Sequence, residues 1–164
     1  MRKSARQTLA RAIAASALLT GASVARATNF SWAAAALVNG NWSTPGNWNP
    51  AGPPGVADYA IVQRLNGRVT LDVSPTTSLG FLGNEQISSG SLILSEAGAA
   101  RTWTATGNMR AEGSGTIILN GPDIVTGAFL TSDTTTVRVN AGSTISTNTL
   151  SLGAAGLGAV YGAI

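Results

Sequence analysis

The chain has 164 residues, contains no cysteine and no histidine, and only 10% of its residues are charged. This composition excludes disulfides, zinc fingers, cysteine nucleophiles and Ser-His-Asp triads, and the length suits one domain with a real core. The formal charge of +3 is misleading, because from Thr28 onward five arginines stand against seven acidic residues, a net charge of −2. A basic surface for nucleic acid or for an anionic membrane is therefore not expected.

Residues 1–27 predict an export signal. Residues 1–11 carry Arg2, Lys3, Arg6 and Arg11 without an acid, residues 12–24 are apolar or small throughout, and Ala25-Arg26-Ala27 matches an A-x-A cleavage site. The apolar run is shorter than the roughly 20 residues that span a bilayer as a helix, so the mature chain is expected to have no transmembrane segment. We expect cleavage after Ala27; the alternative is an amphipathic or uncleaved N-terminal helix.

Residues 28–62 predict an N-terminal cap. They contain three of the four tryptophans and, over residues 40–50, the turn-rich run GNWSTPGNWNP. The end of a stack of strands exposes unpaired edges that natural proteins cover, and large rings on a turn-rich segment suit that task. We therefore expect a Trp-rich cap that leads into a first strand at Ala60–Val62. The alternative is that Trp32, Trp42 and Trp48 form a carbohydrate-binding platform, because indole rings stack on sugar faces.

Residues 63–164 predict repeated short strands. Gly67, Gly90 and Gly115 begin copies of the pattern Gly-x-apolar-x-apolar at intervals of 23 and 25 residues, and Gly142 follows after 27. A second apolar strand recurs between the copies. Such a period is typical of stacked coils, so we expect an all-β fold, a right-handed parallel β-solenoid or β-helix. The alternative is an antiparallel sandwich with coincidental spacing.

The solenoid interpretation makes two further predictions. Serine, threonine and asparagine are expected to form polar ladders between coils. The inner face is expected to include six apolar residues that alternate along the predicted strands, namely Val69, Leu71, Leu92, Leu94, Ile117 and Leu119.

The order of these motifs resembles that of bacterial autotransporter-type passengers. It is also similar to surface proteins with autotransporter-associated β-strand repeats, some of which carry PEP-CTERM sorting tails. The resemblance is carried by Trp42 and Trp48, by PGVADYAI at 54–61, by GTIILNG at 115–121 and by VRVNAGSTI at 137–145. It implies an exported structural or adhesive scaffold, located at the cell surface, at the outer membrane or outside the cell. Its expected partners are surface glycans or other cell-surface proteins.

No catalysis, cofactor or metal ion is expected of this scaffold. The alternative is a polysaccharide-cleaving or carbohydrate-binding β-helix protein. Two pairs of acids, Asp72 with Glu96 and Glu112 with Asp133, are each separated by about one coil length, and paired carboxylates serve as acid and base in glycoside hydrolysis.

The C-terminal end is expected to be unfinished, as in an N-terminal fragment of a longer protein. Residues from Asn140 onward carry no charge, and Gly153–Ile164 contains nothing that resembles the N-terminal cap. An uncovered end of this kind promotes association. We expect it to fray from about Leu150 or to self-associate, and the natural product to continue past Ile164 or to dock this end on a partner.

Overall fold

The computed structural model describes residues 26–33, 39–62, 67–84, 91–113, 115–131, 134–153 and 159–161. Most of the predicted export signal, residues 1–25, lies outside the described residues. A single turn of 3-10 helix covers Pro45–Asn47, and the other regular elements in the described part are strands.

The strands form two sheets. Sheet A runs in the order β13-β11-β9-β7-β4-β1-β3, with β6 also pairing β9, and sheet B runs in the order β14-β12-β10-β8-β5-β2. The strands of sheet A are β1 (Asn29–Trp32), β3 (Trp48–Asn49), β4 (Tyr59–Val62), β6 (Thr76–Thr77), β7 (Leu79–Asn84), β9 (Thr102–Gly113), β11 (Asp123–Thr131) and β13 (Ile145–Leu152). Those of sheet B are β2 (Gly40–Asn41), β5 (Gly67–Leu71), β8 (Ser91–Glu96), β10 (Thr116–Asn120), β12 (Thr136–Val139) and β14 (Ala159–Tyr161).

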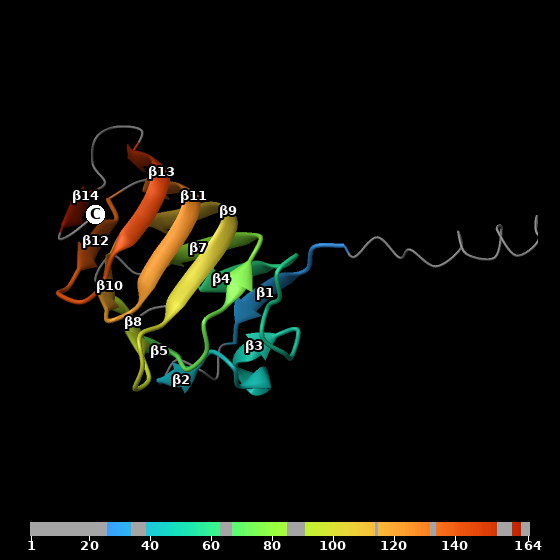
Figure 1. Cartoon of the computed structure of the whole chain (residues 1–164). Coiled ribbons are helices and arrows are strands. Elements are labelled where there is room, and N and C mark those ends of the chain that lie inside the picture. Colours follow the sequence, from blue (N-terminus) through green and yellow to red (C-terminus); the bar gives the residue numbers. More distant parts are fainter. Residues whose placement is uncertain are drawn as a thin grey trace, which may run out of the picture.

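Apart from β3–β4 and β6–β7, which follow one another within sheet A, the chain passes alternately from one sheet to the other, and successive coils stack on one another (Figure 1). Among the described strands, the one antiparallel pair is β1 with β3; the others pair in parallel. The predicted all-β parallel β-solenoid is therefore confirmed, and the antiparallel sandwich is wrong.

Alternation along each strand decides which side chains fill the coils. In β10, Ile117 and Leu119 are buried whereas Thr116 and Ile118 are only partly covered. Stacking in register turns such residues into continuous columns, and the six predicted inner residues are all buried, at 0–3% exposure. Each fully buried aliphatic side chain contributes about 1.5–3 kcal/mol. The interior is thus a filled apolar core rather than a channel.

Polar ladders also join successive coils, as expected. The Thr70 and Ser95 hydroxyls lie 3.2 Å apart in neighbouring strands, and the Asn140 amide donates to Asn120 Oδ1 at 3.1 Å. These bonds form because equivalent positions of successive coils are stacked directly on one another.

The stack begins earlier than predicted. Asn29–Trp32 was expected to belong to the cap, but β1 pairs in parallel with β4 and is itself a coil strand. The first strand is therefore β1, not Ala60–Val62. The covering segment is the chain after β2: its strand β3 turns back antiparallel along the outer edge of β1, with Trp32 opposite Trp48. An antiparallel strand at that position pairs the edge that would otherwise be open.

The fourth glycine of the series, Gly142, does not continue the first three copies of the repeat in one sheet. Gly142 has a φ of +88°, a conformation that glycine adopts cheaply, and the turn that contains it leads into β13 in sheet A. The strand that continues Gly115–Leu119 in sheet B is β12, whose Val137 stacks on Ile117. The sequence pattern of a corner glycine before an apolar residue recurs at more than one corner, so the pattern alone does not identify the sheet.

The last described strand was not predicted. Ala159–Tyr161 forms β14, which pairs in parallel with β12 and returns the chain to sheet B. Residues 154–158 and 162–164 lie outside the described residues.

Candidate binding faces

The four tryptophans form one buried column inside the coils. Ring centroids lie 4.9 Å apart between Trp32 and Trp48, 4.7 Å between Trp42 and Trp48, and 4.7 Å between Trp42 and Trp103, all in edge-to-face geometry. The indole N–H of Trp48 donates to the Trp42 carbonyl at 2.7 Å, and that of Trp103 donates to Thr77 Oγ1 at 3.0 Å. Both polar edges are therefore satisfied inside the core.

This burial corrects the alternative hypothesis of a tryptophan sugar platform. Trp32, Trp42 and Trp48 are brought together, but they are 6%, 1% and 2% exposed. A sugar stacks on an accessible ring face, and here the rings pack against one another. The inward direction of the rings depends on the return of β3 along β1, which the sequence pattern does not reveal.

The described carboxylates bind backbone or side-chain groups of the fold. Asp58 accepts from the Thr28 N–H at 3.0 Å and the Gly55 N–H at 2.9 Å. Asp123 accepts from both the N–H and the hydroxyl of Thr144 in the next coil, at 2.9 and 2.7 Å. Glu112 pairs with Arg110 at 3.2 Å. Asp58 and Asp123 thus hold corners and neighbouring coils in place, whereas Glu112 pairs within its own strand, β9.

The two predicted acid pairs differ in outcome. Asp72 and Glu96 lie at the same corner, but each has its own partner: the N–H and hydroxyl of Ser43 donate to Asp72, whereas the Arg101 N–H donates to Glu96 at 3.0 Å. Asp133, the predicted partner of Glu112, lies outside the described residues.

The pKa of Asp72 is lowered, contrary to what a general acid requires. Partial burial acts to raise the pKa of this carboxyl, but the hydrogen bonds from Ser43, with a smaller contribution from Arg101, outweigh burial and leave the pKa below its ordinary value. The Asp72 carboxyl is therefore held as a carboxylate by its neighbours.

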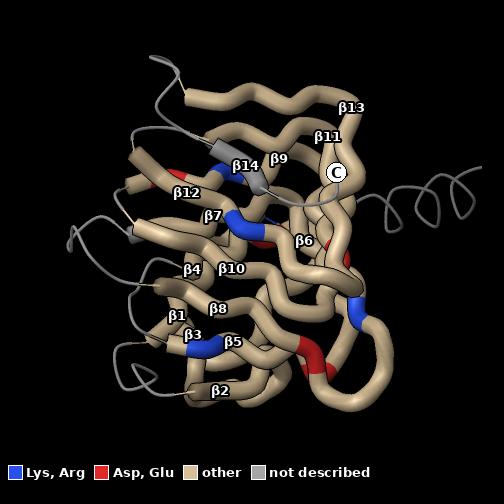
Figure 2. The backbone as a smooth tube through the Cα atoms, turned by 90° about the vertical axis from the view of Figure 1, so that its left-hand side faces the viewer, with Lys and Arg blue, Asp and Glu red and all other residues tan. Residues whose placement is uncertain are grey.

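The outer face of sheet B carries two exposed arginines. Arg68 lies on β5 and Arg138 on β12, and Ile93 and Ile118 lie between them on β8 and β10. Figure 2 views this sheet directly, with arginines in blue on the near strands. The neighbouring outward-facing row lies two residues earlier in β8, β10 and β12. It is polar and consists of Ser91, Thr116 and Thr136 stacked in register.

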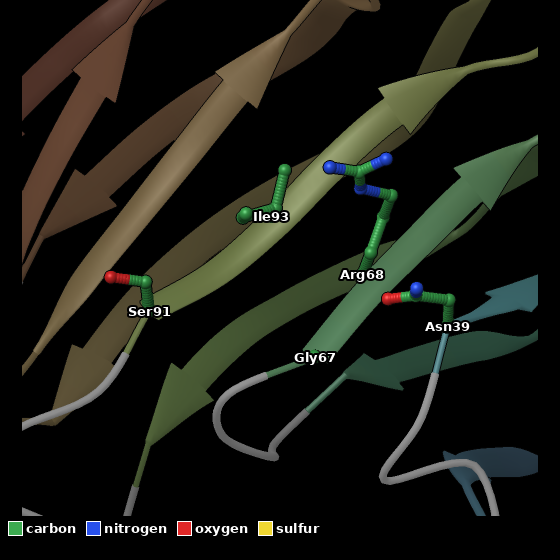
Figure 3. A pocket seen from close by; sticks show the side chains of 5 residues that line it. All are labelled: Asn39, Gly67, Arg68, Ser91 and Ile93. Carbon is green, nitrogen blue, oxygen red and sulfur yellow. The ribbon is translucent and has the colours of Figure 1, made fainter.

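A shallow hollow of about 270 Å³ lies beside Arg68 on this face. It is lined by Asn39, Gly67, Arg68, Ser91 and Ile93. Figure 3 shows the Asn39 amide next to the Arg68 side chain, with Ile93 on the neighbouring strand. A guanidinium, an amide and an apolar surface are thus available together at one exposed position.

The outer face of sheet A has a different character. Ile61, Phe81, Arg110 and Leu130 stack in one row, and a hollow of about 260 Å³ lies between Leu79, Phe81, Asn108 and Arg110. The Arg110 guanidinium is already occupied, because it pairs with Glu112 and lies 5.9 Å from the centre of the Phe81 ring. This row therefore combines three apolar side chains with one paired arginine.

Sequence reasoning missed both outer faces. The arginines of sheet B are 70 residues apart in the sequence, and the net charge from Thr28 onward is negative. The available signal was the apolar-x-apolar repeat itself, which assigns the residue between two inner positions to the outside: Arg68 precedes Val69, and Arg138 lies between Val137 and Val139.

No protein-family model, curated protein or solved structure matches this chain. In the part of the chain that the structure describes, no helix has the length and hydropathy needed to cross a bilayer. Within the same residues, acidic side chains nowhere gather in a group of three or more suited to holding a metal ion.

Proposed function

We propose that this protein is an exported structural scaffold that adheres through the outer faces of its solenoid. One observation carries the proposal: the coil interior is filled by apolar side chains, and the polar groups of the described corners hold successive coils together, which leaves two regular outer faces for binding. A rigid, flat, repetitive surface suits a scaffold, since repeat architectures provide extended binding surfaces. The resemblance to autotransporter-type passengers agrees with this function.

The arrangement of carboxylates supports a non-catalytic role. A polysaccharide-cleaving enzyme of the paired-carboxylate type requires two acids that flank the bond, one of them with a raised pKa. Asp72 has a lowered pKa, and Asp58 and Asp123 bind the backbone of the fold.

Fractionation of cells that produce the full chain with a C-terminal tag tests the export part of the proposal. We expect the product outside the cytoplasm, with Thr28 as its first residue. Retention of residues 1–27 in a cytoplasmic product would contradict the proposal.

A second experiment tests the absence of catalysis. The exported protein is incubated with acidic and neutral polysaccharides, and new reducing ends and unsaturated products are measured. We expect no product above the level obtained with heat-denatured protein. Cleavage that is abolished by Glu112→Gln, Glu96→Gln or Asp72→Asn in a protein that remains folded would replace the scaffold by an enzyme.

A further inference from the structure

One row of the outer face of sheet B combines two cations with two apolar side chains. Arg68 is paired in register with Ile93, Ile93 with Ile118, and Ile118 with Arg138. Both arginines are exposed, and both isoleucines are partly exposed. Neighbouring strands lie about 4.8 Å apart, so the two ends of the row are separated by about 14 Å at the backbone.

The cations of this row are available for a ligand. Among the described residues, neither Arg68 nor Arg138 forms an ion pair, whereas Arg110 on the opposite sheet is paired with Glu112. The one acid within the described strands of sheet B is Glu96, at the end of β8, where it accepts a hydrogen bond from the Arg101 N–H. The net negative charge from Thr28 onward therefore conceals a locally positive face.

We propose that this row binds one chain of an acidic polysaccharide. The carboxylates of two uronate units pair with Arg68 and Arg138, and the apolar faces of the intervening sugar rings lie over Ile93 and Ile118. A guanidinium pairs with a carboxylate through two parallel hydrogen bonds, and the Asn39 amide beside Arg68 supplies a further donor for the same sugar. This inference rests on the proposed adhesive function and names the chemistry of its partner.

The number and spacing of the charges favour a polysaccharide over other polyanions. Nucleic-acid binding at physiological salt requires many phosphate contacts, about 6–10 in typical cases, and anionic lipid recognition relies on clusters of about 4–8 basic residues. Two arginines are too few for either a nucleic acid or an anionic membrane. A ligand of this row needs two anionic groups about 14 Å apart with an apolar stretch between them, and an acidic polysaccharide offers both.

Calorimetric titration of the exported protein with polygalacturonate tests the proposal. Arg68→Gln and Arg138→Gln are each expected to weaken binding about two- to fivefold, the range for an exposed ion pair. The affinity of the double variant should fall by the product of these two factors. Arg110→Gln, on the opposite face, is the matched control and should leave the affinity unchanged. Circular dichroism and thermal melts of each variant establish that it is folded.

Oligomer length provides an independent readout. A uronate oligomer that spans the row should bind more tightly than the disaccharide, because its second carboxylate binds at high effective concentration, and either single substitution should remove that advantage. Equal binding by the wild type and the folded double variant would overturn the proposal, as would equal binding of a neutral polymer. Anionic phospholipid vesicles or single-stranded DNA bound at least as tightly as polygalacturonate would assign the row to another polyanion and overturn it as well. Cell fractionation tests the export of the protein separately, so a failure of these binding experiments would leave the exported scaffold of the proposed function unaffected.

Discussion

At the scale of single residues, Asp72 shows how a corner carboxylate stabilises the stack. The N–H and hydroxyl of Ser43, in the preceding coil, donate to its two carboxylate oxygens, and the pKa of Asp72 is lowered. A carboxyl whose pKa is lower in the folded than in the unfolded state stabilises the fold above its unfolded pKa, about 3.9 for aspartate. That stability is lost as the pH falls through the lower folded value.

Replacement of this carboxylate should therefore have a pH-dependent effect. We expect Asp72→Asn to lower the unfolding free energy at neutral pH by about 1 kcal/mol, the value for charged hydrogen bonds reduced for partial exposure. The difference from the wild type should shrink below about pH 4, and urea titrations at several pH values measure it. Ser43→Ala should show the same loss at neutral pH, and the double variant should lose little more. Additive losses would show that the two groups act independently.

Thr28 and Asp58 connect the expected cleavage to stability. The Thr28 N–H lies 3.0 Å from Asp58 Oδ1, so cleavage after Ala27 would place the new α-ammonium group beside this carboxylate. We expect Asp58→Asn to destabilise the chain that begins at Thr28 more than the chain that retains residues 1–27, by up to about 1 kcal/mol, as for a partly exposed ion pair. Thermal melts of both forms at low and high salt test this. Equal effects in the two forms would mean that the amide and the ammonium group interact equally with Asp58.

At the scale of elements, the alternation of β10 predicts a sharp contrast between neighbouring residues. Ile117 lies inside the coil at 3% exposure, whereas Ile118 is partly exposed on the outer face. We expect Ile117→Ser to destabilise the fold by about 2–5 kcal/mol, through loss of apolar burial and of packing. The same change at Ile118 should cost less than about 1 kcal/mol, which urea denaturation will measure. Similar losses at both positions would contradict the assignment of inner and outer faces.

The packing of β7 against β9 requires a glycine at position 80. A Cβ atom at Gly80 would lie 2.3 Å from Met109 Sδ and 2.9 Å from Trp103 Cζ2. We expect Gly80→Ala to destabilise the fold by about 1–3 kcal/mol, as overpacking of a core does, and to change the near-ultraviolet circular dichroism of the tryptophan column. Gly46→Ala is the matched control, because a Cβ there has no neighbour within 4 Å and the φ is not positive. A loss of the same size at Gly46 would show that the effect at Gly80 does not come from its close contacts with Met109 and Trp103.

At the scale of the whole molecule, stability should fall from the centre of the stack toward β13. β9 pairs with both β7 and β11, whereas among the described strands β13 pairs with β11 alone. In a repeat architecture each coil is stabilised by its neighbours, so an end coil opens more readily. We expect the amides of β13 to exchange hydrogen faster than those of β9.

Two stacked isoleucines provide the matched comparison for this gradient. Ile124 and Ile145 are paired in register and are both buried, at 0% and 1% exposure. Ile124→Ala should cost about 2–5 kcal/mol of global stability, and Ile145→Ala less, because the end coil can open separately. Equal losses, or exchange from β13 as slow as from β9, would indicate that the stack unfolds as a single cooperative unit.

The sequence by itself determined the fold class and the inner face. Burial alternates every second residue along a strand, and coils of similar length repeat the alternation, so both signals are local and periodic. Val69, Leu94 and Leu119 were assigned to one face on this basis, and the structure stacks them in one column. The same rule places Arg68 and Arg138 outside, without saying which residues lie beside them.

The tertiary structure alone decided which distant residues meet. The lengths of the corners set the register between coils, and the register determines that Ile93 and Ile118 separate the two arginines and that Trp103 joins Trp42. Corner lengths vary along the chain, so a spacing of about one coil does not reveal which side chains lie opposite. For this reason the sequence correctly identified the core, but it left open the alternative of a tryptophan sugar platform, which the burial of Trp32, Trp42 and Trp48 rules out.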